Sequence, residues 1–291
     1  MSKLLFTIIS VVLALFARLP LPIAHGLGRL IGWLIYLCSP SYANQIKQNI
    51  KQANITQASK SDNNLLSNII AESGKAILET LLIWLRPNQH LLPLVKKCDG
   101  WDQVEIAINQ GKGLIFLTPH LGCFEITSRY YGAHHPMTVL YRAPRKAWLM
   151  PLINIGRERG GITLAPANAK GVKQLLQALK RGEAIGMLPD QAPLEGEGEW
   201  APFFGRQAYT MTLASKLAQK TGAQVFMAFG ERLSWGRGYH IHIRPIEMGG
   251  INSAERLNSE IERTITRCPE QYLWMYNRYK VRNQPPPPPI K

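Results

Sequence analysis

Near the middle of the chain an apolar run is followed at once by loop-forming residues: Leu114-Ile115-Phe116-Leu117, then Thr118-Pro119-His120-Leu121-Gly122-Cys123-Phe124-Glu125. Four consecutive apolar residues, bounded by Gly113 and Pro119, are typical of a strand that is buried on both faces. A helical pattern follows from Cys123 to Tyr131. The stretch therefore predicts a strand–loop–helix unit, which is the repeating unit of α/β domains.

The same alternation continues along the chain in both directions. Further helices are predicted at Leu65 to Leu85, Lys146 to Arg157, Lys170 to Arg181, Thr210 to Lys220 and Ser253 to Arg267. Further strands are predicted at Met137 to Tyr141, Gly161 to Leu164, Ala184 to Leu188, Gln224 to Phe229 and Tyr239 to Arg244. This order favours an α/β fold with a mixed, largely parallel sheet flanked by helices.

The N-terminal region is apolar and suggests a membrane anchor. Leu4 to Ala17 is almost unbroken, and a second apolar stretch, Ile23 to Leu37, carries His25 and Arg29. A membrane span needs about 20 residues, so an interfacial helix competes with a spanning one. A cleaved signal peptide competes as well, but the small-residue cleavage pattern is missing. We expect an uncleaved N-terminal apolar membrane-anchor helix.

The composition shifts suggest three parts of the chain. Residues 1–40 form the anchor, residues 41–284 the catalytic domain, and residues 285–291 a polyproline tail that cannot join a sheet or helix. Within the domain, residues 41 to 64 are rich in Asn, Gln, Lys and Ser and are expected to be a polar linker.

The charge balance points to an anionic partner. The chain has 34 Lys plus Arg against 19 Asp plus Glu, a formal net charge of +15. Such a surplus suits an anionic bilayer, an acidic protein or a phosphorylated substrate. The basic residues are dispersed, which argues against a nucleic-acid-binding tail. The four cysteines form no C-x-x-C pair, so a reducing compartment is expected.

His120 and Glu125 are the candidate catalytic pair. Histidine suits general-base work near neutral pH, and a carboxylate on one ring nitrogen fixes the tautomer and stabilises the imidazolium. Residues five apart within a helix point about 140° away from each other. The pair can therefore meet only if His120 lies in the loop and Glu125 in the first helical turns. Taken alone, a buried, hydrogen-bonded structural histidine explains the pattern equally well.

The chain resembles a known enzyme family through motifs spread over nearly its whole length. His120-x4-Glu125 is similar to the His-x4-Asp/Glu motif of the glycerolipid and lysophospholipid acyltransferases. The order of motifs most resembles the late acyltransferases of lipid A biosynthesis, which transfer lauroyl and myristoyl groups to Kdo-lipid A. After that motif come Tyr141-Arg142, Gly156-Arg157-Glu158-Arg159, Leu188-Pro189-Asp190-Gln191, Pro202-Phe203-Phe204-Gly205, Pro269-Glu270-Gln271-Tyr272-Leu273-Trp274 and Arg278-Tyr279-Lys280. Many members carry a histidine where this chain has Met275-Tyr276-Asn277.

The resemblance implies a glycerolipid acyltransferase-like fold and a ternary-complex mechanism. His120 would deprotonate a lipid hydroxyl, which attacks the thioester of acyl carrier protein, while Glu125 holds the imidazole. Arg157 would stabilise the oxyanion, with Arg159 as the weaker candidate. The implied partners are acyl carrier protein, a lipid A precursor or related glycolipid, and an anionic membrane at the cytoplasmic face of the inner membrane. No cofactor, metal or nucleic acid is implied.

The remaining motif residues are assigned to substrate binding. Arg142 and Arg159 belong to this group, and Asp190 would touch the lipid headgroup or orient a loop, although a strand-end cap explains it equally well. Phe203, Phe204 and Gly205 are expected to shape the acyl or acceptor pocket; a core turn is the alternative.

Several other hypotheses stay open. Cys123 could pair with His120 as a covalent nucleophile, but a buried packing role is favoured. His240 and His242 could be metal ligands, but no third ligand stands nearby in the sequence, so a surface strand is favoured. A lysophospholipid or aminolipid acyltransferase is the alternative activity. A thioesterase and a catalytically inactive module that binds anionic membranes are the others.

Overall fold

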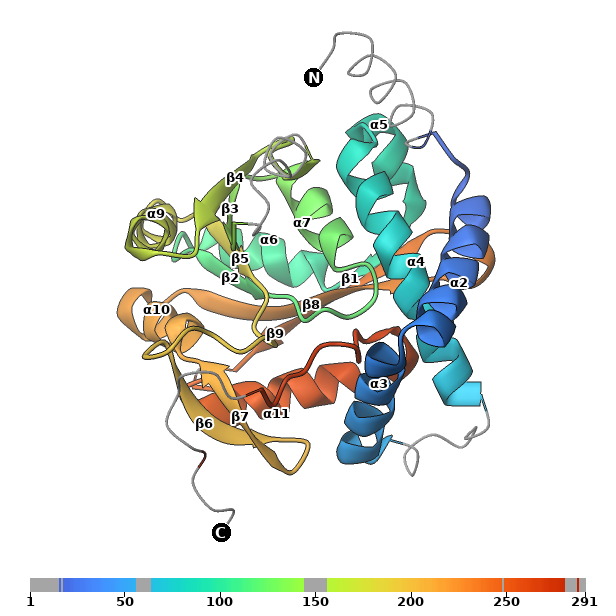
Figure 1. Ribbon diagram of the computed structural model, residues 1–291. Coiled ribbons are helices and arrows are strands. Elements are labelled where there is room, and N and C mark those ends of the chain that lie inside the picture. The colour runs from blue at the N-terminus through green and yellow to red at the C-terminus, as the bar shows by residue number, and fades with distance from the viewer. Residues whose placement is uncertain are drawn as a thin grey trace, which may run out of the picture.

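The computed structural model describes residues 16, 18–55, 64–143, 156–247, 249–280 and 287. Its centre is a seven-stranded sheet with the order β1-β9-β8-β2-β5-β3-β4, and a separate pair, β6-β7, stands below it in Figure 1. All neighbouring strands of the large sheet are parallel except β8 and β9. The prediction of a mixed, largely parallel sheet flanked by helices is confirmed.

The strands of both sheets are short, and most ends agree with the sequence patterns. Their bounds are β1 Val95–Asp99, β2 Leu114–Leu117, β3 Met137–Tyr141, β4 Ile162–Pro166, β5 Ala184–Met187, β6 Gly198–Phe203, β7 Arg206–Met211, β8 Gln224–Arg232 and β9 Tyr239–Ile246. The predicted strands 114–117 and 137–141 are confirmed at both ends. β1 was missed because Lys96 and Lys97 are exposed and interrupt its apolar pattern.

The helices surround this sheet. The described ones are α2 Leu21–Cys38, α3 Pro40–Ala53, α4 Leu65–Leu85, α5 Asn88–Leu91, α6 Trp101–Asn109, α7 Phe124–Gly132, α9 Ala169–Lys180, α10 Leu213–Thr221 and α11 Ala254–Ile265. The prediction for α4 is confirmed at both ends. The helix predicted from Thr210 is wrong at its start, since Arg206–Met211 is strand β7. Residues Phe204 and Gly205, both with positive φ, turn the chain back there.

β2 lies at the centre of the fold with both faces covered. Leu114 and Phe116 pack in one apolar cluster with Ile126 of α7, and Ile115 and Leu117 pack in another with α9 and α11 residues. Figure 1 shows α6 and α7 above the sheet and α11 below it. This double burial explains why the run 114–117 has no polar alternation.

The prediction of a polar linker at residues 41 to 64 is wrong in its first half. Residues 40–53 form α3, with Ala43, Ile46 and Ile50 buried at helical spacing. The side chain of Asn49, also buried, donates hydrogen bonds to the backbone oxygens of Trp274 (2.6 Å) and Tyr276 (2.8 Å). The polar composition masked a helix whose narrow apolar face joins the core.

The N-terminal apolar helix that the structure describes is α2, and it packs along α4 (Figure 1). Gly28 and Gly32 face Gly74 so closely that a Cβ at any of them would overlap the opposite backbone. Of the first apolar stretch, Leu4 to Ala17, all but Phe16 lies outside the described residues. The same holds for most of the helix expected at Lys146 to Arg157 and of the tail Pro285 to Pro289, and the proposed domain boundaries remain predictions.

Candidate active site

Two neighbouring strands bring His120 and Asp190 together. β2 and β5 are parallel with Leu117 opposite Met187, and the chain leaves them through Thr118-Pro119 and Leu188-Pro189. His120 and Asp190 are therefore equally far beyond the paired strand ends. The site lies where carboxyl ends of parallel strands meet, as ligand sites in open α/β sheets usually do.

The carboxylate of Asp190 holds His120 by two hydrogen bonds. The ring Nδ1–H donates to Oδ1 over 2.8 Å, and the backbone N–H of His120 donates to Oδ2 over 2.9 Å. Asp190 is 1% exposed. Burial by itself would raise the pKa of this carboxyl, but the charge and hydrogen bonds of His120 lower it below its usual value. This fixed tautomer leaves Nε2 as the hydrogen-bond acceptor.

Gln191 occupies the acceptor position of that ring. Its side-chain nitrogen lies 3.2 Å from His120 Nε2, the distance and chemistry of an amide donating to a basic nitrogen. A substrate hydroxyl that gives its proton to Nε2 needs the same position. Gln191 must therefore move aside, or slide along the ring, when such a hydroxyl binds.

The loop that carries His120 is fixed by segments far away in the sequence. Leu273 N–H donates to the oxygen of His120 (3.0 Å), Gly122 N–H to Gln271 (3.0 Å) and Cys123 N–H to Gly230 (2.7 Å). The motif at Pro269–Trp274 thus positions the histidine through its backbone, and Asn49 of α3 supports it in turn. Tyr276, in the segment that departs from the family pattern, accepts a hydrogen bond from Ala192 N–H (2.9 Å).

Glu125 binds Arg157, not His120. Arg157 Nε lies 3.0 Å and 3.2 Å from the two carboxylate oxygens, and its terminal nitrogen also contacts Oε1. Its guanidinium stacks on the ring of Trp84, 5.2 Å from the centroid. The pairing of Glu125 with the imidazole that the motif led us to expect is replaced by Asp190, because β5 places that carboxylate directly beside the ring.

A cavity of about 650 Å³ opens on this centre. His120, Gln191 and Arg157 line it, together with two cations from other elements, Arg142 at the end of β3 and Lys216 on α10. Leu140, Val172, Leu188, Met211 and Leu213 supply apolar wall. The cavity therefore offers a base, positive charge and apolar surface in one place.

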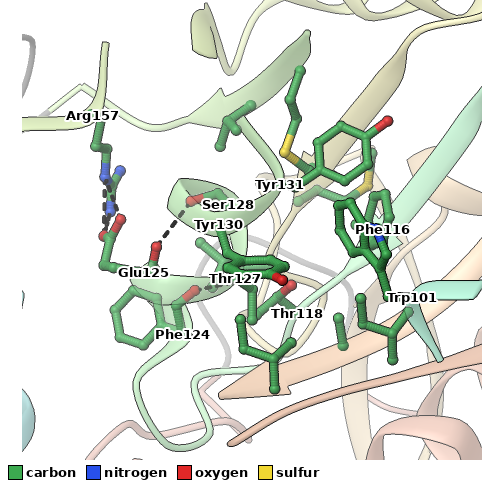
Figure 2. Close-up of a pocket in the computed structure, with 18 residues that line it drawn as sticks. Trp101, Phe116, Thr118, Phe124, Glu125, Thr127, Ser128, Tyr130, Tyr131 and Arg157 are labelled. Carbon is green, nitrogen blue, oxygen red and sulfur yellow. Dashed lines mark hydrogen bonds and ion pairs between the residues drawn. The ribbon is translucent and has the colours of Figure 1, made fainter. Parts of the chain in front are cut away.

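A second, narrow cavity of about 40 Å³ runs beneath α7 from the ion pair into the core. Figure 2 shows Glu125 and Arg157 at one end and Phe116, Tyr131 and Trp101 toward the other. Its walls are largely apolar. It is far smaller than the cavity that opens on His120.

The structure brings some predicted binding residues to the site and leaves others away from it. Arg142 lines the larger cavity. Arg159 donates to the oxygen of Leu85 at the end of α4 over 3.2 Å. Phe203 ends β6, and Phe204 and Gly205 form the turn to β7. None of the three lines the two cavities described above. Phe203 packs in the apolar core, Phe204 is half-buried against it, and Gly205 is exposed.

Cys123 has the environment of a packing residue. It is 2% exposed, and burial raises the pKa of its thiol well above the usual value, with Glu79 adding to the effect. A thiol held protonated is a poor nucleophile. The favoured hypothesis of a structural cysteine therefore has physical support.

His240 and His242 do have a third potential ligand, contrary to the expectation from sequence. Asp99 of β1 lies opposite His242, and the ligand atoms of all three residues lie within 4.8 Å of one another. Asp99 already binds His240 and Lys97, each over 2.8 Å, and Arg267 contacts His242 Nδ1 over 3.2 Å. The carboxylate of Asp99 is thus already paired with Lys97 and His240, and the contact with His240 links β1 to β9.

Sequence reasoning missed three site residues: Gln191, Lys216 and Trp84. Gln191 stood in the quoted motif, so its position after a predicted strand was an available signal. Lys216 and Trp84 lie on helices with no nearby motif, and only the tertiary fold brings them to His120 and Arg157.

These features define a class of protein. A histidine base held by a buried carboxylate, placed at the carboxyl ends of a largely parallel sheet and open to a cavity, is the arrangement of an α/β enzyme that transfers or hydrolyses acyl groups. The raised pKa of the buried Cys123 thiol argues against this cysteine as a covalent nucleophile.

The chain belongs to the bacterial lipid A biosynthesis acyltransferase family, whose sequence profile matches residues 2–281. It is 28% identical to the lipid A biosynthesis palmitoleoyltransferase of Escherichia coli K12 over 93% of this chain and 89% of that protein. It is 25% identical to the lipid A biosynthesis lauroyltransferase of the same organism, over 93% and 90%. The family expected from the motifs is confirmed, and the chain is an acyltransferase.

Proposed function

We propose that this enzyme transfers a fatty acyl group from acyl carrier protein to a hydroxyl of a Kdo-lipid A type precursor. The observation that carries the proposal is the orientation of His120: Asp190 holds Nδ1–H, while Nε2 faces the larger cavity. The curated relatives are lipid A palmitoleoyl- and lauroyltransferases, which supports a lipid A precursor as acceptor.

The transfer proceeds through one tetrahedral intermediate. The acceptor hydroxyl gives its proton to His120 Nε2 as its oxygen attacks the thioester carbon. When the intermediate collapses, the carbon–sulfur bond breaks and the leaving thiolate takes the proton from Nε2. Asp190 stabilises the imidazolium throughout. No cofactor is needed to balance these steps.

Arg157 is the proposed oxyanion donor, and Glu125 is a positioning residue for it. Arg157 lines both cavities, and the ion pair with Glu125 and the ring of Trp84 restrict its guanidinium. A donor fixed near the developing charge contributes about 2.7–4 kcal/mol to transition-state stabilisation. The narrow apolar cavity beneath Arg157 is the proposed binding site of the acyl chain, and this cavity has to widen when the chain enters.

Acidic groups of the acceptor would meet Arg142 and Lys216 at the larger cavity. Lipid A precursors carry phosphates and carboxylates, and acyl carrier protein is acidic, so both proposed substrates suit a chain with a net charge of +15. The apolar N-terminal region would hold the enzyme at the cytoplasmic face of the inner membrane.

One assay tests donor, acceptor and reaction type together. The purified full chain is given acyl carrier protein thioester with a Kdo-lipid A precursor, with a lysophospholipid, or with no acceptor, and the products are followed by mass spectrometry. We expect acylated lipid A precursor as the dominant product. Transfer chiefly to lysophospholipid would assign the alternative activity, and acyl release that needs no acceptor would make the enzyme a thioesterase. Equal rates with acyl coenzyme A would contradict the carrier-protein donor.

A further inference from the structure

Helix α2 has two chemically different faces. On the inner face Leu21, Ala24, His25, Gly28 and Gly32 are buried. The opposite face exposes a stripe of large apolar side chains spaced three and four residues apart: Ile23, Leu27, Leu30, Leu34 and Leu37. Their exposed fractions run from 46% to 70%. We call this stripe the outer face of α2.

The inner face is bound to protein by a buried ionic network. His25 Nε2 lies 3.4 Å from Glu79 of α4, and Glu79 pairs with Arg232 of β8, whose Nε lies 2.7 Å away. The glycine contacts with Gly74 bring the two helix backbones together. α2 is long and apolar enough to cross a bilayer, but a crossing helix would have to leave this network or carry it into lipid, where charged groups are costly.

Trp235 lies in a short 3-10 turn, Ser234–Gly236, that contacts the start of α2. The Trp235 side chain is 89% exposed. Its backbone has φ 61° and ψ 22°, a conformation that bulky residues rarely adopt. Its neighbour Gly236 is in contact range of Leu21 and Pro22. A strained backbone that presents a large aromatic side chain to solvent suggests a function for that side chain.

Cations border this surface. Three arginines are exposed: Arg18 three residues before α2, Arg29 near the middle of α2, and Arg237 two residues after Trp235. Tryptophan is enriched at the headgroup level of membranes, and nearby cations favour an anionic leaflet. An interfacial helix typically combines an apolar stripe, an aromatic side chain and bordering arginines, as this surface does.

We propose that the outer face of α2 and Trp235 form one surface that inserts into an anionic bilayer leaflet. The axis of α2 then lies parallel to the membrane plane, and the helix does not cross the bilayer. This inference deepens the membrane attachment proposed above and rests on it, but it does not depend on the acyl-transfer chemistry. A crossing helix would bury the same stripe at graded depths, whereas a flat helix buries all of it equally.

Depth measurements along the stripe test this geometry. Ile23, Leu30 and Leu37 are changed one at a time to cysteine in a Cys38→Ser full-length background and labelled with an environment-sensitive fluorophore. The protein is bound to vesicles of phosphatidylethanolamine and phosphatidylglycerol, and lipids carrying quenchers at known depths report the position of each label. Ile106→Cys, an equally exposed apolar site on α6, is the matched control.

We expect similar, shallow depths at all three α2 sites and no quenching at residue 106. A deep label at Leu30 between two shallow ones would show a spanning helix and overturn the proposal. Labels whose fluorescence emission is blue-shifted without lipid, and is not quenched in vesicles, would show that a second copy of the chain covers the stripe. This result would also overturn the proposal. Local depth is the readout because the first apolar segment can hold the chain to vesicles by itself.

Trp235→Gly provides an independent test with effects of opposite sign. Glycine adopts positive φ without strain, so the variant should have a higher melting temperature. It should also bind vesicles several-fold more weakly, because the aromatic anchor is lost. A lower melting temperature would show that Trp235 supports the fold, and unchanged vesicle binding would remove it from the membrane surface.

Discussion

At the scale of single residues, the site depends on which carboxylate meets His120. Asp190 holds the ring and the backbone of His120, whereas Glu125 holds Arg157. In the proposed mechanism, His120 and Asp190 act as one unit, the base with its carboxylate, and Arg157 and Glu125 act as another, the oxyanion donor with its carboxylate. The two acids should therefore have different kinetic signatures.

Removing the base or its carboxylate should lower turnover strongly. For His120→Ala we expect a loss of about 10²–10⁴-fold in kcat, the usual contribution of general-base catalysis. Asp190→Asn should also lower kcat strongly, because the imidazolium loses its counter-charge. Glu125→Gln should lower kcat less, because Arg157 keeps its contact with the ring of Trp84. A larger loss with Glu125→Gln than with Asp190→Asn would restore Glu125 as the partner of the imidazole.

The two arginines should respond differently to lysine. Arg157→Lys should lower kcat by about 10²–10³-fold, as expected when an oxyanion donor is lost, because a lysine point charge cannot replace the planar fork that Glu125 and Trp84 hold. Arg159→Lys should be mild. Steady-state kinetics separate the cases. A defect confined to KM would mean that Arg157 only binds substrate, and a larger effect at Arg159 would mean that Arg157 is not the oxyanion donor.

At the scale of elements, α2 is joined to α4 through glycines where side chains would not fit. A Cβ at Gly32 overlaps the backbone oxygen of Ile70, while a Cβ at Gly26, on the same helix, meets nothing within 4 Å. Close backbone approach, not flexibility, is therefore the requirement at Gly32.

This contrast predicts opposite effects of the same substitution. Gly32→Ala should destabilise the protein by about 1–3 kcal/mol, as overpacking does. Gly26→Ala should stabilise it by about 0.5–1 kcal/mol, because alanine suits a helix interior better than glycine does. Chemical denaturation of both variants in the same detergent measures the difference. Equal effects would show that α2 is not held at this distance from α4.

At the scale of the whole molecule, one buried ionic network connects the N-terminal helix, α4 and the sheet. Glu79 accepts from Arg232 of β8 and Tyr239 of β9, and faces His25 of α2. Burial by itself would raise the pKa of Glu79, but Arg232 and His25 lower it from 4.5 to about 2. Such a carboxylate contributes stability that is fully present above its unfolded pKa and is lost as pH falls.

The network should therefore govern acid stability. Between pH 4.5 and about 2 the melting temperature of the wild type should fall as Glu79 becomes protonated in the unfolded state first. Glu79→Gln should be less stable at pH 7 by about 3–5 kcal/mol, because buried Arg232 loses its closer carboxylate and keeps only the more distant Glu72, 3.3 Å away, among the described acidic residues. Its melting temperature should depend less on pH in that window. The same slope in both proteins would assign the acid transition to other groups.

Several local units and the family could be predicted from the order of residues alone. The run 114–117 could only be a buried strand, β3 and α4 were predicted at both ends, and the motif order identified an acyltransferase of lipid A biosynthesis. These features depend on periodicity and residue type within one segment, which the chain displays directly. The helix α3 was missed because its apolar face is narrow, and β1 because its lysines break the pattern.

Only the tertiary structure decided which residues meet. Asp190 is 70 residues from His120 and becomes its partner because β5 packs beside β2 in register. The packing of other elements against the sheet brings Gln191, Lys216 and Trp84 to the site. Phe203 packs in the apolar core. Strand order results from how all helices and strands bury their apolar faces together, and no single segment carries that information.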